Sequence, residues 1–420
     1  MQQRSSIRQS PVALIVGVVV LIALLTWAGG WALPFVIFAV IAIVMGHEFG
    51  HYLTAKRAGF LVTDFFVGFG PIIWSTTRGE TRYGVRALPF GGYVKVPGMS
   101  WTETIDPALE ARTYRAASYP KKVLFASAGS LMHVLMALTL AWASLAFIGQ
   151  PSPSHVDVAQ FSKWDGHKET VAQLAGLKVG DQIVAVNGTQ ILSPTQLDTA
   201  IHDNVGRSLT LTVDRGGNDL TLHATPVNGQ NIDVNGTPLV QKSAGPSGYI
   251  GIEIGEASVH SSVFAAVPRA FSYVGTAISS TVSSLVRVFS LHEFLSLFHQ
   301  VASPAAANSK VNQQTRPESI VGVVRIAVQG AQNGWSTLIA ILVIVNIFIG
   351  VLNMLPILPL DGGYVAIATY ERLRSRRGTR YHADINRLAP LIYAFMSVLL
   401  VLFACTLYLD IVHPIANPFN

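Results

Sequence analysis

The sequence predicts a polytopic α-helical membrane protein with a membrane-associated β-hairpin region and one inserted α+β domain. Half of the 420 residues are hydrophobic and only 12% are charged, with a mean hydropathy of +0.43. This composition is typical of a chain that lies mostly in lipid. Several apolar runs reach the roughly 20 residues that a helix needs to cross a hydrocarbon core. Two stretches between these runs are rich in glycine, β-branched and aromatic residues, which favours strands and turns.

The expected segments follow the apolar runs in chain order. Lys and Arg side chains near the ends of the runs decide which loops are cytoplasmic, because such loops carry an excess of positive charge. The prediction is a cytoplasmic N-terminus (1–10), an extra transmembrane helix (11–28), a second span (33–56), a cytoplasmic or membrane-associated β-loop region (57–118), a third span (119–148), an extracytoplasmic α+β domain (151–256), an extracytoplasmic amphipathic and linker region (257–335), a broken span (336–366), a cytoplasmic Arg-rich loop (367–387), a last span (388–409) and an extracytoplasmic tail (410–420).

Charge and cysteine content exclude some classes of function. The net charge of +6 gathers at the membrane ends, which indicates topology rather than binding to nucleic acid. Cys405 is the only cysteine, so the chain forms no internal disulfide, and a thiolate zinc site is disfavoured.

A His-Glu-x-x-His motif lies at the end of the second apolar run. On a helix, His47 and His51 are one turn apart, so both imidazoles face one side and can share a Zn²⁺ ion. Glu48 lies close enough to take a proton from a water on that metal. No charged residue stands between Arg8 and His47, and ionisable groups in such a segment usually face a cavity, a partner or a metal. The sequence therefore predicts a catalytic zinc centre near the cytoplasmic end of this span.

A third zinc ligand is expected from the broken span. Pro356 and Pro359 interrupt it before Asp361, and a broken helix is tolerated in a bilayer where its backbone lines a cavity or packs on protein. Asp361 can supply a carboxylate ligand there, and helix capping is the alternative role. His133, in the third span, is more typical of a hydrogen-bonded packing residue, with support of a ligand, contact with substrate or ligation as alternatives.

The glycine-rich stretch from Gly59 to Met99 predicts short strands and hairpins. Two interpretations remain open at this point. The stretch is either an ordinary cytoplasmic loop domain or a β-hairpin beside the metal that offers an edge strand to an unwound substrate.

The inserted domain carries a recognisable pattern between Ala175 and Gly188. Alternation over 183–186 followed by Asn187-Gly188 predicts a strand and a tight turn, 194–203 a helix, and 208–213 another strand. This pattern resembles a PDZ domain of the bacterial protease type, in which a peptide or an upstream-cleaved terminus binds as an added strand.

Taken together, the HExxH motif, Gly91-Gly92-Tyr93-Val94-Lys95, the single PDZ-like insert and the run from Asn353 to Gly362 resemble the site-2 protease family of intramembrane zinc metalloproteases. The resemblance implies that His47, His51 and Asp361 bind zinc and that Glu48 activates water. It also implies that Asn353 contacts the substrate backbone or the developing oxyanion, and that the substrate meets the stretch made of Gly91, Gly92, Tyr93, Val94 and Lys95. Many relatives have Gly-Pro and then Asn in the third span, where this chain has Gly129-Ser130 and His133.

The resemblance implies a multi-pass enzyme of the inner (plasma) membrane that cleaves transmembrane segments of single-span proteins, such as trimmed anti-sigma factors or remnant signal peptides. Its expected partners are these substrates, membrane lipid and a peptide at the PDZ-like domain. Two rival functions are a PDZ-bearing scaffold without protease activity and an ion-coupled transporter. Glu48 argues against the scaffold, and the presence of a single broken helix argues against the transporter.

Overall fold

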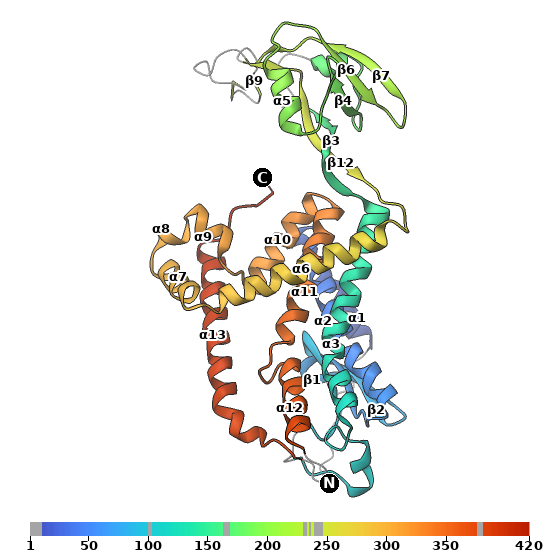
Figure 1. The fold of residues 1–420 in the computed structure, drawn as a ribbon, viewed down its shortest axis with the longest axis vertical. Coiled ribbons are helices and arrows are strands. Elements are labelled where there is room, and N and C mark those ends of the chain that lie inside the picture. The colour runs from blue at the N-terminus through green and yellow to red at the C-terminus, as the bar shows by residue number, and fades with distance from the viewer. Residues whose placement is uncertain are drawn as a thin grey trace. The chain divides into compact units, whose positions relative to one another are not determined.

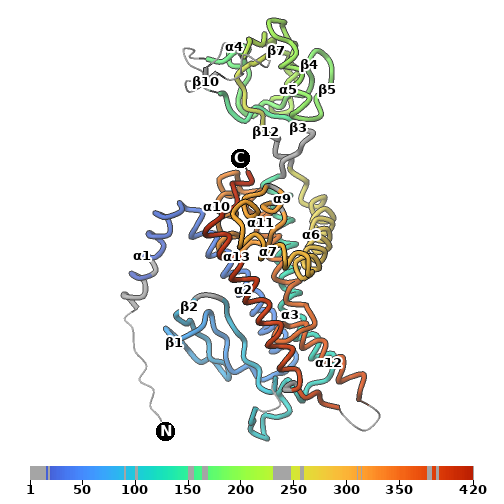
Figure 2. Tube along the Cα trace, turned by 90° about the vertical axis from the view of Figure 1, so that its left-hand side faces the viewer, coloured from blue at the N-terminus to red at the C-terminus, as the bar shows by residue number. Residues whose placement is uncertain are grey.

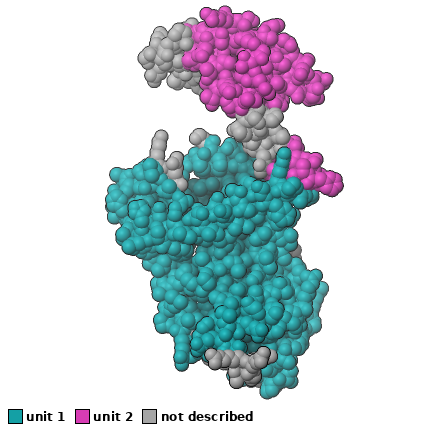
Figure 3. Space-filling view, in the orientation of Figure 1, with its two compact units in different colours: residues 1–142, 267–420 teal, residues 143–266 magenta. Residues whose placement is uncertain are grey.

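The computed structural model describes residues 11–99, 103–162, 169–229, 233–234, 237–238, 247–375 and 381–419. The predicted N-terminal segment 1–10 and residues 376–380 of the Arg-rich loop lie outside the described residues. The chain forms two compact units, one made of residues 1–142 and 267–420 and the other of residues 143–266 (Figure 3).

Four helices in the described part are long and apolar enough to cross a membrane, which confirms the prediction of a chain with several membrane-capable helices. They are α2 (Ala32–Ala58), α3 (Tyr119–Ala143, continued by a π turn to Ile148), α11 (Trp335–Asn353) and α13 (Ala389–Val412). Helix α1 (Pro11–Gly29) precedes them. The predicted break after the fourth apolar run is present, because α11 ends at Asn353 and α12 (Asp361–Arg374) begins eight residues later.

Residues 257–335, predicted to be an amphipathic and linker region, form five helices, α6 to α10, among the residues that the structure describes. Helices α6 (Ala266–Val288) and α7 (Leu291–Ala302) meet at 69°, and α6 runs across the direction of α11 and α13 in Figure 1. The polar stretch after α7, which lies in the predicted linker region, forms the short helices α8 (Pro304–Ala307) and α9 (Lys310–Thr315), each capped by a serine. Helix α10 (Ile320–Gln332) then buries Ala327 and Ala331 against α2 and α11.

The predicted hairpin is present and longer than expected. Strands β1 (Asp64–Arg78) and β2 (Thr81–Lys95) fold back on themselves, so that Val67 lies opposite both Val85 and Gly92. The last part of β2 pairs on one side only among the described residues, which makes it an edge. Strand β2 packs against α2, and Figure 2 shows the hairpin beside that helix.

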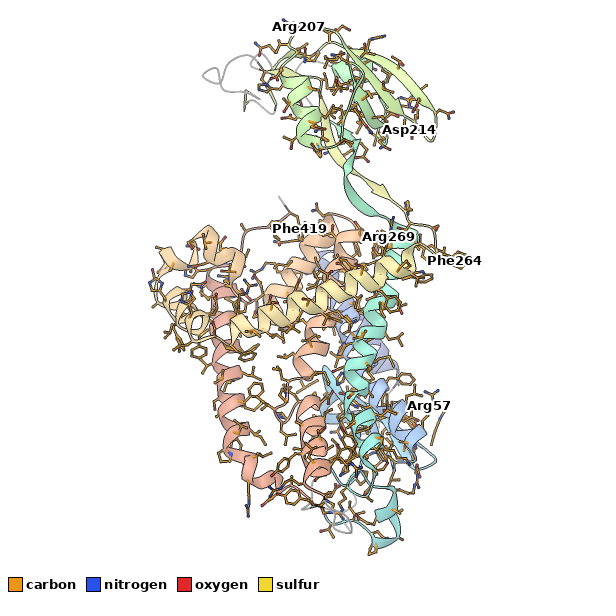
Figure 4. The ribbon with its side chains drawn as sticks, viewed as in Figure 1. Arg57, Arg207, Asp214, Phe264, Arg269 and Phe419 are labelled. Carbon is orange, nitrogen blue, oxygen red and sulfur yellow. The ribbon has the colours of Figure 1, made fainter. Side chains whose placement is uncertain are left out.

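The second unit is an α+β module. Its main sheet has the order β12-β3-β4-β6-β7 with β5 beside β4, and burial alternates along β6, which confirms the predicted strand there. Figure 4 labels Asp214 at the end of β6 and Arg207 two residues before its start. Asn187 and Gly188 both have positive φ and form the predicted tight turn. The elements are β3 (Gln150–Phe161), α4 (Val171–Leu174), β4 (Gln182–Val186), β5 (Thr189–Gln190), α5 (Pro194–His202), β6 (Leu209–Asp214), β7 (Asp219–Ala224) and β12 (Ile252–Val259), with two short pairs, β8 (Val227–Asn228) with β11 (Gly248–Tyr249) and β9 (Asp233–Val234) with β10 (Thr237–Pro238).

Candidate metal centre

Three side chains from two distant segments converge in the first unit. On α2, His47 and His51 are one turn apart and both buried, as the HExxH spacing predicts. Asp361 comes from α12, and its Oδ2 atom lies 3.2 Å from the Nε2 atoms of both His47 and His51. The two Nε2 atoms are themselves 3.2 Å apart. Two imidazole nitrogens and one carboxylate oxygen thus form a nearly equilateral triangle.

This triangle fits a zinc ion. Zinc takes His nitrogen and Asp oxygen at about 2.0–2.2 Å in tetrahedral geometry, which places neighbouring ligand atoms roughly 3.3 Å apart. The observed separations of 3.2 Å agree with that value. A zinc ion held by these three residues would keep one position for water or substrate, as catalytic rather than structural zinc sites do.

Glycines let α2 and α3 approach closely around the histidines. A Cβ atom at Gly50 would lie 2.6 Å from the carbonyl oxygen of Ala128, and one at Gly129 would overlap the ring of His47. This approach allows the Nδ1 atom of His51 to reach the carbonyl of Phe125 at 2.8 Å. A hydrogen bond from Nδ1–H to that carbonyl leaves Nε2 unprotonated and aimed at the metal position. Residue types alone do not reveal this carbonyl, although the small-residue spacing Gly46-x-x-x-Gly50 is a signal of close helix packing.

Asp361 is positioned by the break between α11 and α12. It is the first residue of α12, and the capping position before it is Leu360, whose side chain makes no cap. The carboxylate faces the histidines instead, so the alternative of a helix-capping Asp is wrong. The next two residues, Gly362 and Gly363, leave no room for a side chain. A Cβ atom at either position would lie within 2.5 Å of a backbone atom of Leu355 or Leu358.

Glu48 lies between the metal triangle and the end of strand β2. A Cβ atom at Gly92 would be only 3.3 Å from Glu48 Cγ, so the glycine permits the strand to pass this close. The backbone N–H of Val94 faces the Glu48 carboxylate. The sequence stretch 91–95 therefore runs directly alongside the HExxH motif, as the edge-strand interpretation expects.

Asn353 and His133, two other predicted site residues, are not part of the triangle of ligand atoms. Asn353 ends α11 and is half-buried, and within the described residues its side chain makes no hydrogen bond. His133 is fully buried, and its ring centroid is 5.0 Å from that of His47. Its Nδ1 atom contacts Asn346 Oδ1, and it lies outside the group of ligand atoms that fall within 4.8 Å of one another. The structure thus places His133 beside a ligand rather than among the ligands.

Comparison with known proteins identifies the family. The model of peptidase family M50 matches residues 35–399, which include the motif on α2 and Asp361 on α12. The chain belongs to peptidase family M50. The zinc metalloprotease Rip1 of Mycobacterium bovis is 30% identical over 409 residues, covering 90% of this chain and 96% of Rip1. A putative zinc metalloprotease of Nostoc sp., all3971, is 29% identical over 345 residues, covering 80% of this chain and 86% of that protein.

A chloroplast protein of Arabidopsis thaliana, the probable membrane metalloprotease ARASP2, is 25% identical over 348 residues, covering 80% of this chain and 70% of ARASP2. These relatives confirm the predicted resemblance to the site-2 protease family, the zinc cofactor and the assignment as a metalloprotease.

Proposed function

We propose that this M50 metalloprotease cleaves peptide bonds within the transmembrane segments of single-span membrane proteins. The observation that carries the proposal is the convergence of His47, His51 and Asp361 on membrane-capable and broken helices, with Glu48 beside them. A metal centre on a membrane-capable helix can reach peptide bonds inside the bilayer, which a soluble protease does not reach.

The roles of the residues follow from their places. Zinc, when bound, supplies a Lewis acid that polarises a scissile carbonyl and acidifies water. His47, His51 and Asp361 hold it, and the hydrogen bond of His51 to the Phe125 carbonyl fixes the ring orientation. Glu48 takes the proton from the attacking water and passes it to the leaving amine, as general bases do in metalloproteases.

The substrate must be extended before it is cleaved, because a helix hides its carbonyls in its own hydrogen bonds. We infer that the end of β2, the stretch from Gly91 to Lys95, pairs with the unwound substrate as an added strand. Its position against Glu48 supports this role, since a strand added there lies next to the catalytic carboxylate. Asn353 is proposed to contact the substrate backbone, and substrates with helix-breaking residues at the cleaved bond are expected to be preferred.

We propose an inner-membrane location with the metal centre in the cytoplasmic half of the bilayer and the α+β module outside the cytoplasm. Lys56 and Arg57 at the end of α2 support this orientation, because cytoplasmic flanks are enriched in basic residues. Figure 4 shows Arg57 at this end of α2. The module, interpreted as PDZ-like, would bind an upstream-cleaved terminus or exclude substrates whose outer domain is intact.

The decisive experiment is co-expression of the full chain with a tagged single-span membrane protein whose outer domain has been removed. Glu48→Gln keeps the shape of the side chain and removes its basicity, so cleavage should fall by about 10²- to 10⁴-fold while zinc content stays the same. Glu293→Gln on α7 makes the same chemical change away from the metal group and should cleave normally. Undiminished cleavage by Glu48→Gln would remove the proposed mechanism.

A further inference from the structure

The two metal-ligating histidines differ in how their second ring nitrogen is satisfied. His51 Nδ1 is hydrogen bonded to the Phe125 carbonyl. His47 Nδ1 is buried and has no hydrogen-bond partner in the part of the chain that the structure describes. Since Nε2 of His47 faces the metal position, its Nδ1 carries the proton and needs an acceptor. His47 therefore lacks the supporting hydrogen bond that His51 has.

His133 has a buried ring nitrogen that lacks a hydrogen-bond donor. The amide nitrogen of Asn346 donates to the backbone carbonyl of His133 at 2.8 Å, and this bond fixes the orientation of the amide group. The amide oxygen of Asn346 therefore faces His133 Nδ1, which must carry the proton in order to donate to it. In the neutral ring the other nitrogen, Nε2, is then an acceptor. That nitrogen is buried and, among the described residues, also without a partner.

The donor and the acceptor lie on neighbouring rings. The centroids of His47 and His133 are 5.0 Å apart, with an angle of 43° between the ring planes. Both rings are held in place by close helix packing. Gly129, one turn before His133 on α3, lies against the ring of His47, and a Cβ atom at Gly350 on α11 would lie 2.8 Å from His133 Cβ. Buried donors and acceptors are costly to leave unpaired.

We propose that His133 Nε2 accepts the hydrogen bond of His47 Nδ1–H, directly after a small ring rotation or through one water, and so positions His47 as a zinc ligand. Asn346 acts one step further out by holding His133 in the required tautomer. His133 is thus a positioning residue and not a catalytic one. Asn346 and His133 thus orient the ring of His47, as the Phe125 carbonyl orients the ring of His51.

The test measures zinc affinity of the purified full chain by competition with a chelator. In His133→Leu the acceptor is lost, and zinc should bind about 10- to 100-fold more weakly, as when a group that supports a ligand is removed. His133→Gln places an amide oxygen near the position of Nε2, and its affinity should return to within about threefold of wild type. Ser130→Ala is the matched control, because it removes another buried hydrogen bond between α3 and α11, to Gly350 O, without touching the acceptor.

Cobalt substitution gives a second readout, since the visible spectrum of bound Co²⁺ reports ligand geometry and should change in His133→Leu but not in Ser130→Ala. Wild-type affinity in His133→Leu, or equal loss in the Leu and Gln variants, would overturn the role of His133. The inference rests on the proposed metal centre, and failure of the wild-type chain itself to bind zinc would overturn that centre instead. The two failures are therefore distinguishable.

Discussion

At the scale of single residues, the metal centre depends on one oxygen atom contributed from far along the chain. Asp361 Oδ2 is equidistant from the two imidazole nitrogens, and 310 positions separate Asp361 from His51. Its side chain is 19% exposed, whereas those of the histidines are 9% and 8% exposed. The carboxylate thus closes the side of the triangle nearest to solvent.

Asp361→Asn replaces this anionic ligand by a neutral amide of the same size. We expect zinc affinity to fall by at least about 100-fold, because changes to groups that merely support a ligand already cost 10- to 100-fold. Metal analysis of purified protein by mass spectrometry checks this. Asp384→Asn, at an exposed carboxylate of the same charge, should keep its zinc. A full zinc complement in Asp361→Asn would show that the third ligand lies elsewhere.

The sequence was sufficient to predict that His47, His51 and Asp361 form one possible metal group, since motif spacing and the apolar setting both point to them. The catalytic role of Glu48 stays a prediction. The sequence could not predict the Phe125 carbonyl or the contact of His133 with Asn346, because these depend on which faces of α2, α3 and α11 meet. A backbone carbonyl cannot be recognised from residue type. The contact of His133 is with Asn346, 213 positions further along the chain.

At the scale of elements, α10 is attached to the end of α13 by a buried polar cluster. Arg316 donates to Asp410 Oδ1 at 3.1 Å, and both side chains are fully buried. The N–H of Ser319, which caps α10, donates to the other carboxylate oxygen at 2.6 Å, and Arg325 donates to the Asp410 carbonyl at 2.6 Å. Glu318 adds a second carboxyl group, and a Cβ atom at Gly322 would touch both acids.

This cluster predicts a pH dependence of stability. Burial raises the pKa of Glu318 to about 7, and the nearby Asp410 carboxylate adds to this, while Arg316 and Arg325 oppose it. A carboxyl with a raised folded-state pKa stabilises the fold below its unfolded pKa of about 4.5, and this contribution is lost as pH rises through 7. For a half-buried group the loss is about 1–2 kcal/mol.

The melting temperature of the wild type should therefore be lower at pH 8 than at pH 5.5, and Glu318→Gln should remove most of that difference. Unfolding in detergent can be followed with a thiol-reactive dye, since Cys405 on α13 is the only cysteine and is partly buried. Glu169→Gln, at an exposed glutamate of the other unit, should melt like the wild type at both pH values. An unchanged pH response in Glu318→Gln would contradict the assignment to this group.

Helices and strands were predictable from the sequence where one pattern of apolar or glycine residues dominates a segment. The apolar helices and the glycine-punctuated hairpin were evident, whereas α8, α9 and α10 were not. The first two are only four and six residues long and are set by serine caps. Helix α10 is too short to span a membrane, and its small residues are buried only because α2 and α11 lie beside it. Its stability is a tertiary effect, which a reading of local pattern does not capture.

At the scale of the whole molecule, the proposed topology predicts opposite accessibility for two exposed arginines, Arg57 and Arg207, both labelled in Figure 4. In a Cys405→Ser background, Arg207→Cys in the α+β module should react with a membrane-impermeant maleimide on intact cells. Arg57→Cys at the end of α2 should react only after permeabilisation, because basic flanks stay in the cytoplasm. Equal labelling of both positions on intact cells would contradict the topology.

The family was predictable from the sequence, because the motifs point to it and the family model matches residues 35–399. The side of the membrane on which each loop lies rests on the distribution of Lys and Arg alone. The PDZ-like character of the module likewise stays a prediction, since the observed strands and turn agree with the pattern without deciding its ligand.

Helix α12 is a rod of fourteen residues, about 21 Å long. Its first residue is the metal carboxylate, and near its other end Glu371 accepts a 2.9 Å hydrogen bond from Lys122 of α3, with both side chains buried. Helix α12 is therefore held by polar contacts near both of its ends. A substitution that breaks the pair of Lys122 and Glu371 is expected to displace Asp361 Oδ2 as well.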